Sequence, residues 1–201
     1  MLAVAGEVGR LKTETYISAD VEADGPIPGP YSMISMGMTV AGRMTGKVFE
    51  PVDPQTFTLY VELRPISDDH VPEALAVSGL DRETLIREGR DPAEAMREAA
   101  VWVREVCGNS SPVLAAYPLS YDWMWIYWYF MRFTGVSPFG HSRCIDLKTL
   151  YAAKAGVPIG WATKRQMPEH LRSRRPHTHN ALDDAIEQAE LLQNLMAFER
   201  R

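Results

Sequence analysis

Four acidic side chains in three separate stretches are the residues of this sequence best suited to chemistry. In "ADVEADG", Asp20 and Glu22 stand two positions apart, and on a strand such residues point to the same face. Asp122 follows "AAYPLSY", and Asp184 stands in "HNALDDA", five residues after His179. Like charges on one face repel each other, so either that face is open to water or a multiply charged cation lies between the carboxylates.

The donor atoms of such a cluster indicate the cation and the reaction. Carboxylate oxygens suit Mg²⁺ or Mn²⁺ better than Zn²⁺. Two such ions about 4 Å apart can activate a water molecule and stabilise the leaving oxygen in phosphodiester cleavage. Histidine is the usual side chain for proton transfer at neutral pH, and His179 lies close to Asp184 in sequence, so it is the natural base for the proton of that water.

Strand-like stretches come early in the chain. The stretch "TYISADVEA" predicts a first strand over residues 15–23, and "SPVLAAY" predicts a short buried strand over 111–117. Two further strands are predicted over 33–42 and 48–65. In the last of these, apolar and polar residues alternate as in a half-buried antiparallel strand, with an expected buried face of Phe57, Leu59, Val61 and Leu63.

Helix-like stretches follow and alternate with the later strands. Apolar spacing and caps predict helices over 72–79, 81–89, 91–107, 122–133, 144–156 and 180–200. The stretch "DWMWIYWYFMRF" is apolar on nearly all sides, which predicts a core helix. This order of elements predicts an α/β fold with a mixed sheet. We expect a flexible leader over 1–13 and a single domain over 14–201.

Composition limits the class of protein. The chain has 201 residues, of which 46% are apolar and 23% charged, as in ordinary globular proteins. No stretch is long and apolar enough to span a bilayer, so no membrane partner is expected. The two cysteines, Cys107 and Cys144, have no CxxC spacing and predict free thiols in a reducing cytoplasm. A net charge of −5 argues against a broad basic surface for duplex nucleic acid, but a metal-holding cleft brings its own positive charge.

The three acidic stretches, taken in order, resemble the exonuclease motifs of the DEDDh 3′→5′ exonucleases, which include polymerase proofreading subunits, ribonuclease T and oligoribonuclease. The Asp-x-Glu motif is matched by Asp20 and Glu22, and the second motif by Asp122. The His-x₄-Asp motif, typical of the histidine form, is matched by His179 and Asp184. The resemblance extends over residues 15 to 198.

The resemblance implies a ribonuclease H-like fold, with a mixed β-sheet flanked by helices. It implies removal of nucleotides from the 3′ end of single-stranded RNA or DNA, with release of nucleoside 5′-monophosphates. It also implies that two Mg²⁺ or Mn²⁺ ions are held by four carboxylates and that His179 is the base; the four ligands are Asp20, Glu22, Asp122 and Asp184. Family members often form homodimers.

The sequence departs from the family beside two of the motifs. Ala23 stands where many members carry Thr, and "GPIPGPY" follows in a region that contacts the terminal nucleotide in the family. Tyr117 and Pro118 replace an His-Asn pair that often precedes the second motif. These changes leave the expected metal ligands intact and bear on how the substrate is held.

Several polar and aromatic residues have a structural interpretation. We expect Asp24 to form a turn beside Gly25, Asp183 to be solvated and Asp146 to cap a helix. Core packing is expected of the aromatic residues Trp123, Trp125 and Trp128, although base stacking is the alternative. A basic segment over 164–178 is either a solvated loop or a contact for backbone phosphates; its charges are Lys164, Arg165, Arg172, Arg174 and Arg175.

Three other functions stay open from the sequence. The first is a catalytically inactive exonuclease-like module that binds nucleic-acid ends. The second is a binding module with a structural zinc site, although the spacing of its candidate ligands matches no common zinc pattern; these are His141, Cys144, His170, His177 and His179. The third is a ribonuclease H-like endonuclease, which would lack the His-x₄-Asp arrangement.

Overall fold

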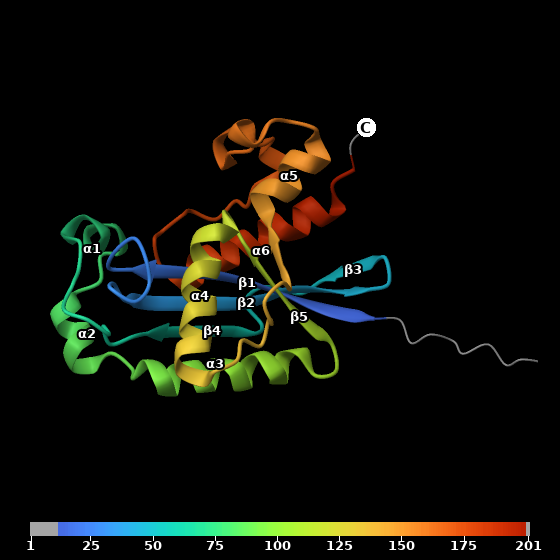
Figure 1. Cartoon of the computed structure of the whole chain (residues 1–201). Helices are drawn as coiled ribbons and strands as arrows, with labels where there is room; N and C mark the ends of the chain where they lie inside the picture. Colours follow the sequence, from blue (N-terminus) through green and yellow to red (C-terminus); the bar gives the residue numbers. More distant parts are fainter. Residues whose placement is uncertain (1–11, 200–201) are drawn as a thin grey trace, which may run out of the picture.

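A twisted mixed β-sheet forms the centre of the molecule (Figure 1). The computed structural model describes residues 12–199. The strand order is β3-β2-β1-β5-β6, and β4 also pairs with β2. β2 runs antiparallel to its partners, whereas β5 is parallel to β1 and β6 is parallel to β5. The strands are β1 (Thr13–Ala23), β2 (Met33–Thr45), β3 (Val48–Pro51), β4 (Thr58–Glu62), β5 (Ser111–Ala116) and β6 (Cys144–Asp146).

Helices cover both faces of the sheet, as the sequence predicted for an α/β fold. The helices α3 (Pro92–Cys107) and α4 (Leu119–Thr134) pack on one face. The helices α5 (Leu147–Ala155) and α6 (Ala181–Ala197) pack on the other. Two short helices, α1 (Pro72–Ser78) and α2 (Arg82–Glu88), lie between β4 and α3 in the chain.

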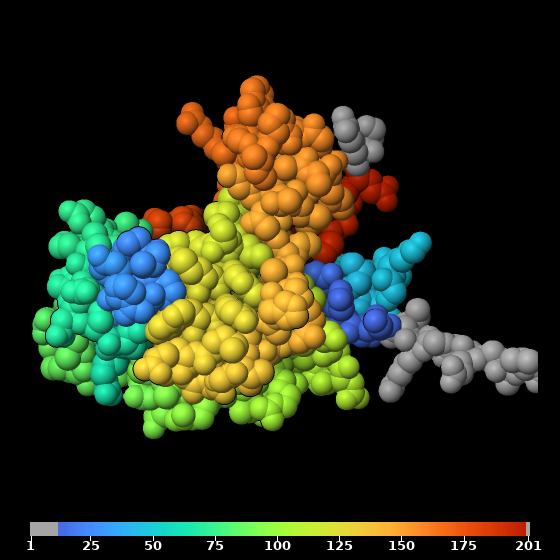
Figure 2. All heavy atoms as spheres, viewed as in Figure 1, coloured from blue at the N-terminus to red at the C-terminus, as the bar shows by residue number. Residues whose placement is uncertain are grey.

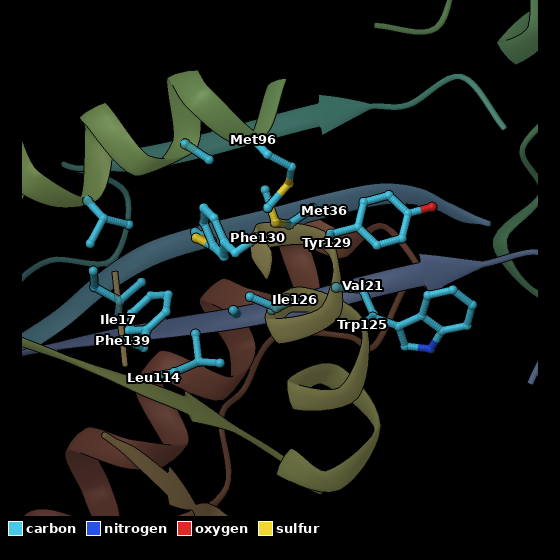
Figure 3. Close-up of a cluster of buried hydrophobic side chains, with 14 of the residues drawn as sticks. Ile17, Val21, Met36, Met96, Leu114, Trp125, Ile126, Tyr129, Phe130 and Phe139 are labelled. Carbon is cyan, nitrogen blue, oxygen red and sulfur yellow. The ribbon is translucent and has the colours of Figure 1, made fainter. Parts of the chain in front are cut away.

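The larger core lies between the sheet and α4 (Figure 3). Ile17 of β1 and Met36 of β2 belong to the same cluster as Trp125, Ile126 and Phe130 of α4, and all five side chains are completely buried. Burying each large apolar side chain contributes about 1.5–3 kcal/mol to stability. The prediction that the aromatic stretch forms a core helix is confirmed, and Trp123 and Trp128 pack against the same cluster. This packing fixes the position of the first turn of α4.

The prediction of a single strand over 48–65 was wrong. Its ends form two strands, β3 and β4, which pair with different parts of β2. β3 ends at Pro51, and Pro54 lies in the stretch between the two strands; neither proline has an amide hydrogen to donate to a strand ladder, which favours an interruption here. The expected buried face also fails at one end, since Phe57 is 39% exposed and lies beneath the guanidinium of Arg43.

The helix predicted over 144–156 begins later than expected. Residues 144–146 form β6, and only 147–155 are helical. Asp146 caps α5, as predicted, by accepting a hydrogen bond of 2.6 Å from the Thr149 amide. Its other carboxylate oxygen accepts a bond of 2.7 Å from the Leu119 amide at the start of α4. One side chain therefore holds the first turns of two helices.

A leader was predicted over residues 1–13. Residues 1–11 of it lie outside the described residues, and β1 begins at Thr13. Among the residues that the structure describes, no helix has the length and apolar character needed to cross a membrane.

Candidate active site

The site begins where β1 extends beyond its neighbour β5. The pairing of β1 with β5 ends at Ser18, whereas its pairing with β2 continues to Ala23. Asp20 and Glu22 lie on this extension. The Val21 amide between them is not needed by β5 and donates a hydrogen bond of 3.2 Å to Asp122. Because β5 ends before this point, the edge of β1 is unpaired there, and Asp122 can reach it.

Asp122 comes to this gap from the first turn of α4. It is 4% exposed, and its helix starts where the Asp146 carboxylate accepts the Leu119 amide. The buried aromatic residues further along α4 anchor the same helix against the sheet. The bond between Asp146 and Leu119 and the packing of the aromatic residues together fix the position of Asp122.

Asp184 reaches the site because α6 begins very close to the sheet. Gly37 of β2 is paired with Asp20, and a Cβ atom on Gly37 would lie 2.3 Å from the Ala181 carbonyl group. Any side chain at position 37 would push the start of α6 outwards. Glycine at this position lets the first turn of α6 carry the completely buried Asp184 to β1.

The local hydrogen bonds explain the spacing of His179 and Asp184. The Asp184 carboxylate accepts the Thr178 and His179 amides, each at 2.9 Å, so it reaches back over the residue that caps α6. That cap is Asn180, which accepts the Leu182 and Asp183 amides. His179 has a φ of 58°, in the left-handed region, and its exposed side chain leaves the chain just before the helix.

The structure brings three of the four predicted carboxylates into one group. Asp20, Glu22 and Asp184 each offer an oxygen within 4.8 Å of the others. Asp122 lies beside this group, bonded to the amide between Asp20 and Glu22. A second group with the same spacing consists of His177, His179 and Asp184. Asp184 therefore belongs to both groups.

The carboxylates are in an environment that opposes their ionisation. Burial raises the pKa of Asp20 well above its usual range, and the charges of Asp122, Glu22 and Asp184 raise it further. Burial also raises the pKa of Asp122 to about 8, although the Val21 amide partly opposes this. The pKa of Glu22 rises to about 7, through burial and then the charge of Asp184.

These properties fit divalent cations. Asp20, Glu22 and Asp122, whose pKa values are raised, gain most from positive charge placed among them, because a cation offsets both their mutual repulsion and the cost of their burial. All the donors in the acidic group are oxygens, which Mg²⁺ and Mn²⁺ prefer. The acidic group can therefore hold divalent metal.

Sequence reasoning missed Gln188. Its side-chain amide donates a bond of 2.7 Å to Asp20, and its carbonyl oxygen accepts a bond of 2.6 Å from the Tyr117 amide. Gln188 stands four residues after Asp184, on the same face of α6. That spacing was the signal available in the sequence, but only the fold shows that this face meets β1 and the end of β5.

The basic segment divides into parts with different surroundings. Lys164 pairs with Glu187, lies 5.4 Å from the centre of the Tyr117 ring and lowers the pKa of Asp20 and Asp122. Arg175 pairs with Glu190 at 2.7 Å. Arg172 and Arg174 are exposed and line an open surface hollow of about 1060 Å³ beside α6.

The remaining polar predictions have simple outcomes. Asp183 is exposed, as expected. Asp24 is completely buried, accepts the Ser32 amide at 2.6 Å and pairs with Arg82 at 3.4 Å, so it does more than form a turn. Within residues 12–199, no metal-like group includes the other residues of the zinc hypothesis, which are His141, Cys144 and His170.

One face of the molecule is hollowed between two segments that lie far apart in the sequence. Figure 2 shows a notch between a protruding lobe, which contains α5 and the segment after it, and the blue loop that follows β1. Orange-red atoms of the chain leading into α6 lie at the side of this notch. Within the acidic group, Asp20 and Glu22 are half-buried and therefore partly accessible to solvent, whereas Asp184 is buried.

Comparison with known proteins defines the class of enzyme. A 3′-5′ DNA exonuclease named Cap18, from Escherichia coli, is 37% identical over 183 residues, which are 90% of this chain and 91% of that protein. No protein-family model matches the chain. The protein is a 3′→5′ exonuclease, a phosphodiester hydrolase.

Solved structures agree on the fold. A 3′-exonuclease studied for 3′-end-specific recognition of a histone mRNA stem-loop has a TM-score of 0.65 and 13% identity; the match covers 92% of this chain and 64% of that one. The nuclease domain of 3′hExo, a DEDDh family member bound to rAMP, has a TM-score of 0.63 and 13% identity, with 92% and 91% covered. The predicted ribonuclease H-like fold is confirmed. The chain belongs to the DEDDh 3′→5′ exonucleases.

Proposed function

We propose that this protein removes nucleotides one at a time from the 3′ end of single-stranded DNA and releases nucleoside 5′-monophosphates. Four carboxylates would hold two Mg²⁺ or Mn²⁺ ions, and His179 would be the base; the four are Asp20, Glu22, Asp122 and Asp184. The observation that carries the proposal is the convergence of Asp20, Glu22 and Asp184 within 4.8 Å, with Asp122 bonded to the strand between them.

The residues of the chain have separate tasks in this reaction. When bound, the two ions supply a nucleophilic water and stabilise the leaving oxygen. His179 accepts the proton of the attacking water as its oxygen bonds to phosphorus, and the bond from phosphorus to the 3′-oxygen breaks. Asp184 holds His179 through the backbone amide, and Gln188 fixes Asp20. Lys164 adds positive charge beside Asp20 and Asp122.

We favour DNA over RNA because the relative with 37% identity is a DNA exonuclease. The structurally similar 3′-exonuclease of the histone mRNA stem-loop shares only 13% identity, so it supports the fold and not the substrate. A single strand is proposed because the half-buried Asp20 and Glu22 and the exposed His179 leave the site open to solvent, and an unpaired end reaches it without melting of a duplex.

The test uses 5′-labelled single-stranded DNA and RNA of one sequence, with Mg²⁺, Mn²⁺ or EDTA. We expect metal-dependent shortening by single nucleotides, faster on DNA, and 5′-monophosphate products. His179→Ala should lower the rate by about 10²–10⁴-fold, the usual contribution of a general base. Asp184→Asn should abolish shortening.

Matched controls separate these effects from damage to the fold. Asp183→Asn changes the exposed neighbour of Asp184, and His170→Ala changes an exposed histidine of the same basic segment. Both should retain nearly full activity. Circular single-stranded DNA should stay intact, and its cleavage would instead support an endonuclease. A folded protein that shortens none of these substrates would refute the proposal.

A further inference from the structure

His177 is a histidine beside the site that the proposed reaction does not use. Its Nδ1 atom lies 3.1 Å from Oδ1 of Asp184 and 3.7 Å from Oε2 of Glu187. Its ring meets the ring of His179 edge to face, with the centres 4.6 Å apart. Two imidazoles and one carboxylate therefore come together at the N-terminal end of α6.

The donor set of this group differs from that of the acidic group. His177, His179 and Asp184 each offer a donor atom within 4.8 Å of the others, and two of these donors are imidazole nitrogens. Nitrogen with oxygen is a set that suits Zn²⁺ and is poor for Mg²⁺. Two atoms bound to one tetrahedral zinc at about 2.0–2.2 Å stand about 3.3–3.6 Å apart. The 3.1 Å between the His177 and Asp184 donor atoms is slightly shorter than that separation, so a small outward movement of the exposed His177 ring would give it.

The three residues are both fixed and accessible. Asp184 is completely buried and held by the Thr178 and His179 amides, so its position is set before any ion arrives. The His177 side chain is 48% exposed, and His179 is also exposed. The donor atoms of all three residues already lie within 4.8 Å of one another, and both rings are on the surface, where an ion can reach them.

We propose that His177, His179 and Asp184 form a zinc site, and that its occupation inhibits the nuclease. A nitrogen lone pair of His179 that is bound to zinc cannot accept the proton of the attacking water. The Asp184 oxygen that binds zinc is withdrawn from the acidic group. The inhibitory consequence rests on the proposed function, whereas zinc binding itself does not.

Binding is tested by titrating Zn²⁺ into the protein in millimolar Mg²⁺, with isothermal calorimetry as the readout. We expect one zinc ion per chain. His177→Ala should weaken zinc binding by at least about tenfold, because even the loss of residues that only support metal ligands costs 10–100-fold. His170→Ala, which changes an exposed histidine outside the group, should bind zinc as the wild type does.

A second variant locates the ion. Asp20→Asn alters the acidic group but leaves His177, His179 and Asp184 in place, so its zinc affinity should stay within about threefold of the wild type. Thermal unfolding in EDTA checks that each variant is folded. No zinc binding by the wild type, unchanged affinity in folded His177→Ala, or loss of binding in Asp20→Asn would each overturn the site.

Inhibition is measured separately, as the zinc concentration that halves exonuclease activity relative to each variant's own zinc-free rate. In His177→Ala this concentration should rise by at least about tenfold, in step with the loss of affinity. Equal zinc sensitivity of His177→Ala and the wild type would overturn the inhibitory role. A wild type that binds zinc but has no nuclease activity would refute the proposed function and leave the zinc site standing.

Discussion

Asp24 and Asp122 are both buried at the ends of elements near the site, yet they have opposite partners. Asp24 is completely buried, accepts the Ser32 amide at 2.6 Å and pairs with Arg82 at 3.4 Å. Asp122 is 4% exposed and accepts the Val21 amide, but its charged neighbours include Glu22. Asp24 is paired directly with an arginine, whereas Asp122 lies beside Glu22 and is influenced only from a distance by Lys164, which pairs with Glu187.

The electrostatics follow from those partners. Burial raises the pKa of Asp24, but the Ser32 amide and Arg82 oppose the rise. Burial raises the pKa of Asp122 to about 8, and Glu22 adds to the effect. A buried carboxylate with its own arginine serves the fold. A buried carboxylate among others costs stability until a cation arrives, which is the property expected of a metal ligand.

The sharpest test replaces Asp122 and Asp24 by asparagine in two separate variants. Asp122→Asn should lower exonuclease activity by at least about 10³-fold, since a metal ligand should matter no less than a general base. In EDTA at pH 8 it should also raise the melting temperature, because a buried like charge is removed. Asp24→Asn should lower the free energy of unfolding by about 3 kcal/mol, because Arg82 loses its partner.

The same two variants can also contradict the distinction between Asp24 and Asp122. Folded Asp24→Asn should retain most of its activity in single-nucleotide shortening assays below its melting temperature. If Asp24→Asn were as inactive as Asp122→Asn while still folded, the distinction between a structural and a functional carboxylate would be wrong.

Gly37→Ala should separate Asp184 from Asp20. The added methyl group would meet the Ala181 carbonyl group at 2.3 Å, so the start of α6 must shift away from β1. A displacement of about 1 Å in a catalytic group can cost about 10²-fold in rate. We expect that loss in activity, together with weaker binding of Mg²⁺ in calorimetry. Gly160→Ala, where an added methyl group meets nothing, is the matched control; equal activity of both variants would contradict this reading of Gly37.

Gln188→Ala tests the positioning of Asp20. Loss of the 2.7 Å bond to Asp20 should raise the Mg²⁺ concentration needed for half-maximal activity by about tenfold, as for other residues that orient metal ligands. Gln193→Ala is the control, because Gln193 on the same helix bonds the Ala41 and Val52 carbonyl oxygens instead. A merely structural role for Gln188 would change stability and leave the Mg²⁺ dependence as it was.

The smallest expected effect is a dependence of stability on pH in EDTA. Glu22 and Asp122 have folded pKa values of about 7 and about 8, above the 4.5 and 3.8 of free side chains. The native state therefore binds more protons than the unfolded state between about pH 4 and pH 8, so the free energy of unfolding falls as pH rises through this window. Asp122→Asn should flatten the fall, and so should saturating Mg²⁺ in the wild type. Denaturant unfolding at several pH values measures it, and identical slopes would contradict the pKa shifts.

The sequence by itself determined the features that depend on near neighbours. Residues two apart on a strand share a face, which predicted that Asp20 and Glu22 point together. Helix caps and apolar spacing predicted α3 and α6, and Asp146 was recognised as a cap. The His-x₄-Asp spacing is also local, because Asp184 accepts the amide of His179 across the helix cap. Short-range geometry of this kind is encoded in a few consecutive residues.

The tertiary structure decided which distant residues meet. The sequence does not show that β5 ends before Asp20, that Gly37 admits α6, or that Gln188 reaches Asp20. It also predicted one strand where β3 and β4 form two, because the alternation of residues carries no information about which part of β2 each end will join. These outcomes depend on contacts between segments far apart in the chain, which only close packing of the sheet and helices brings together.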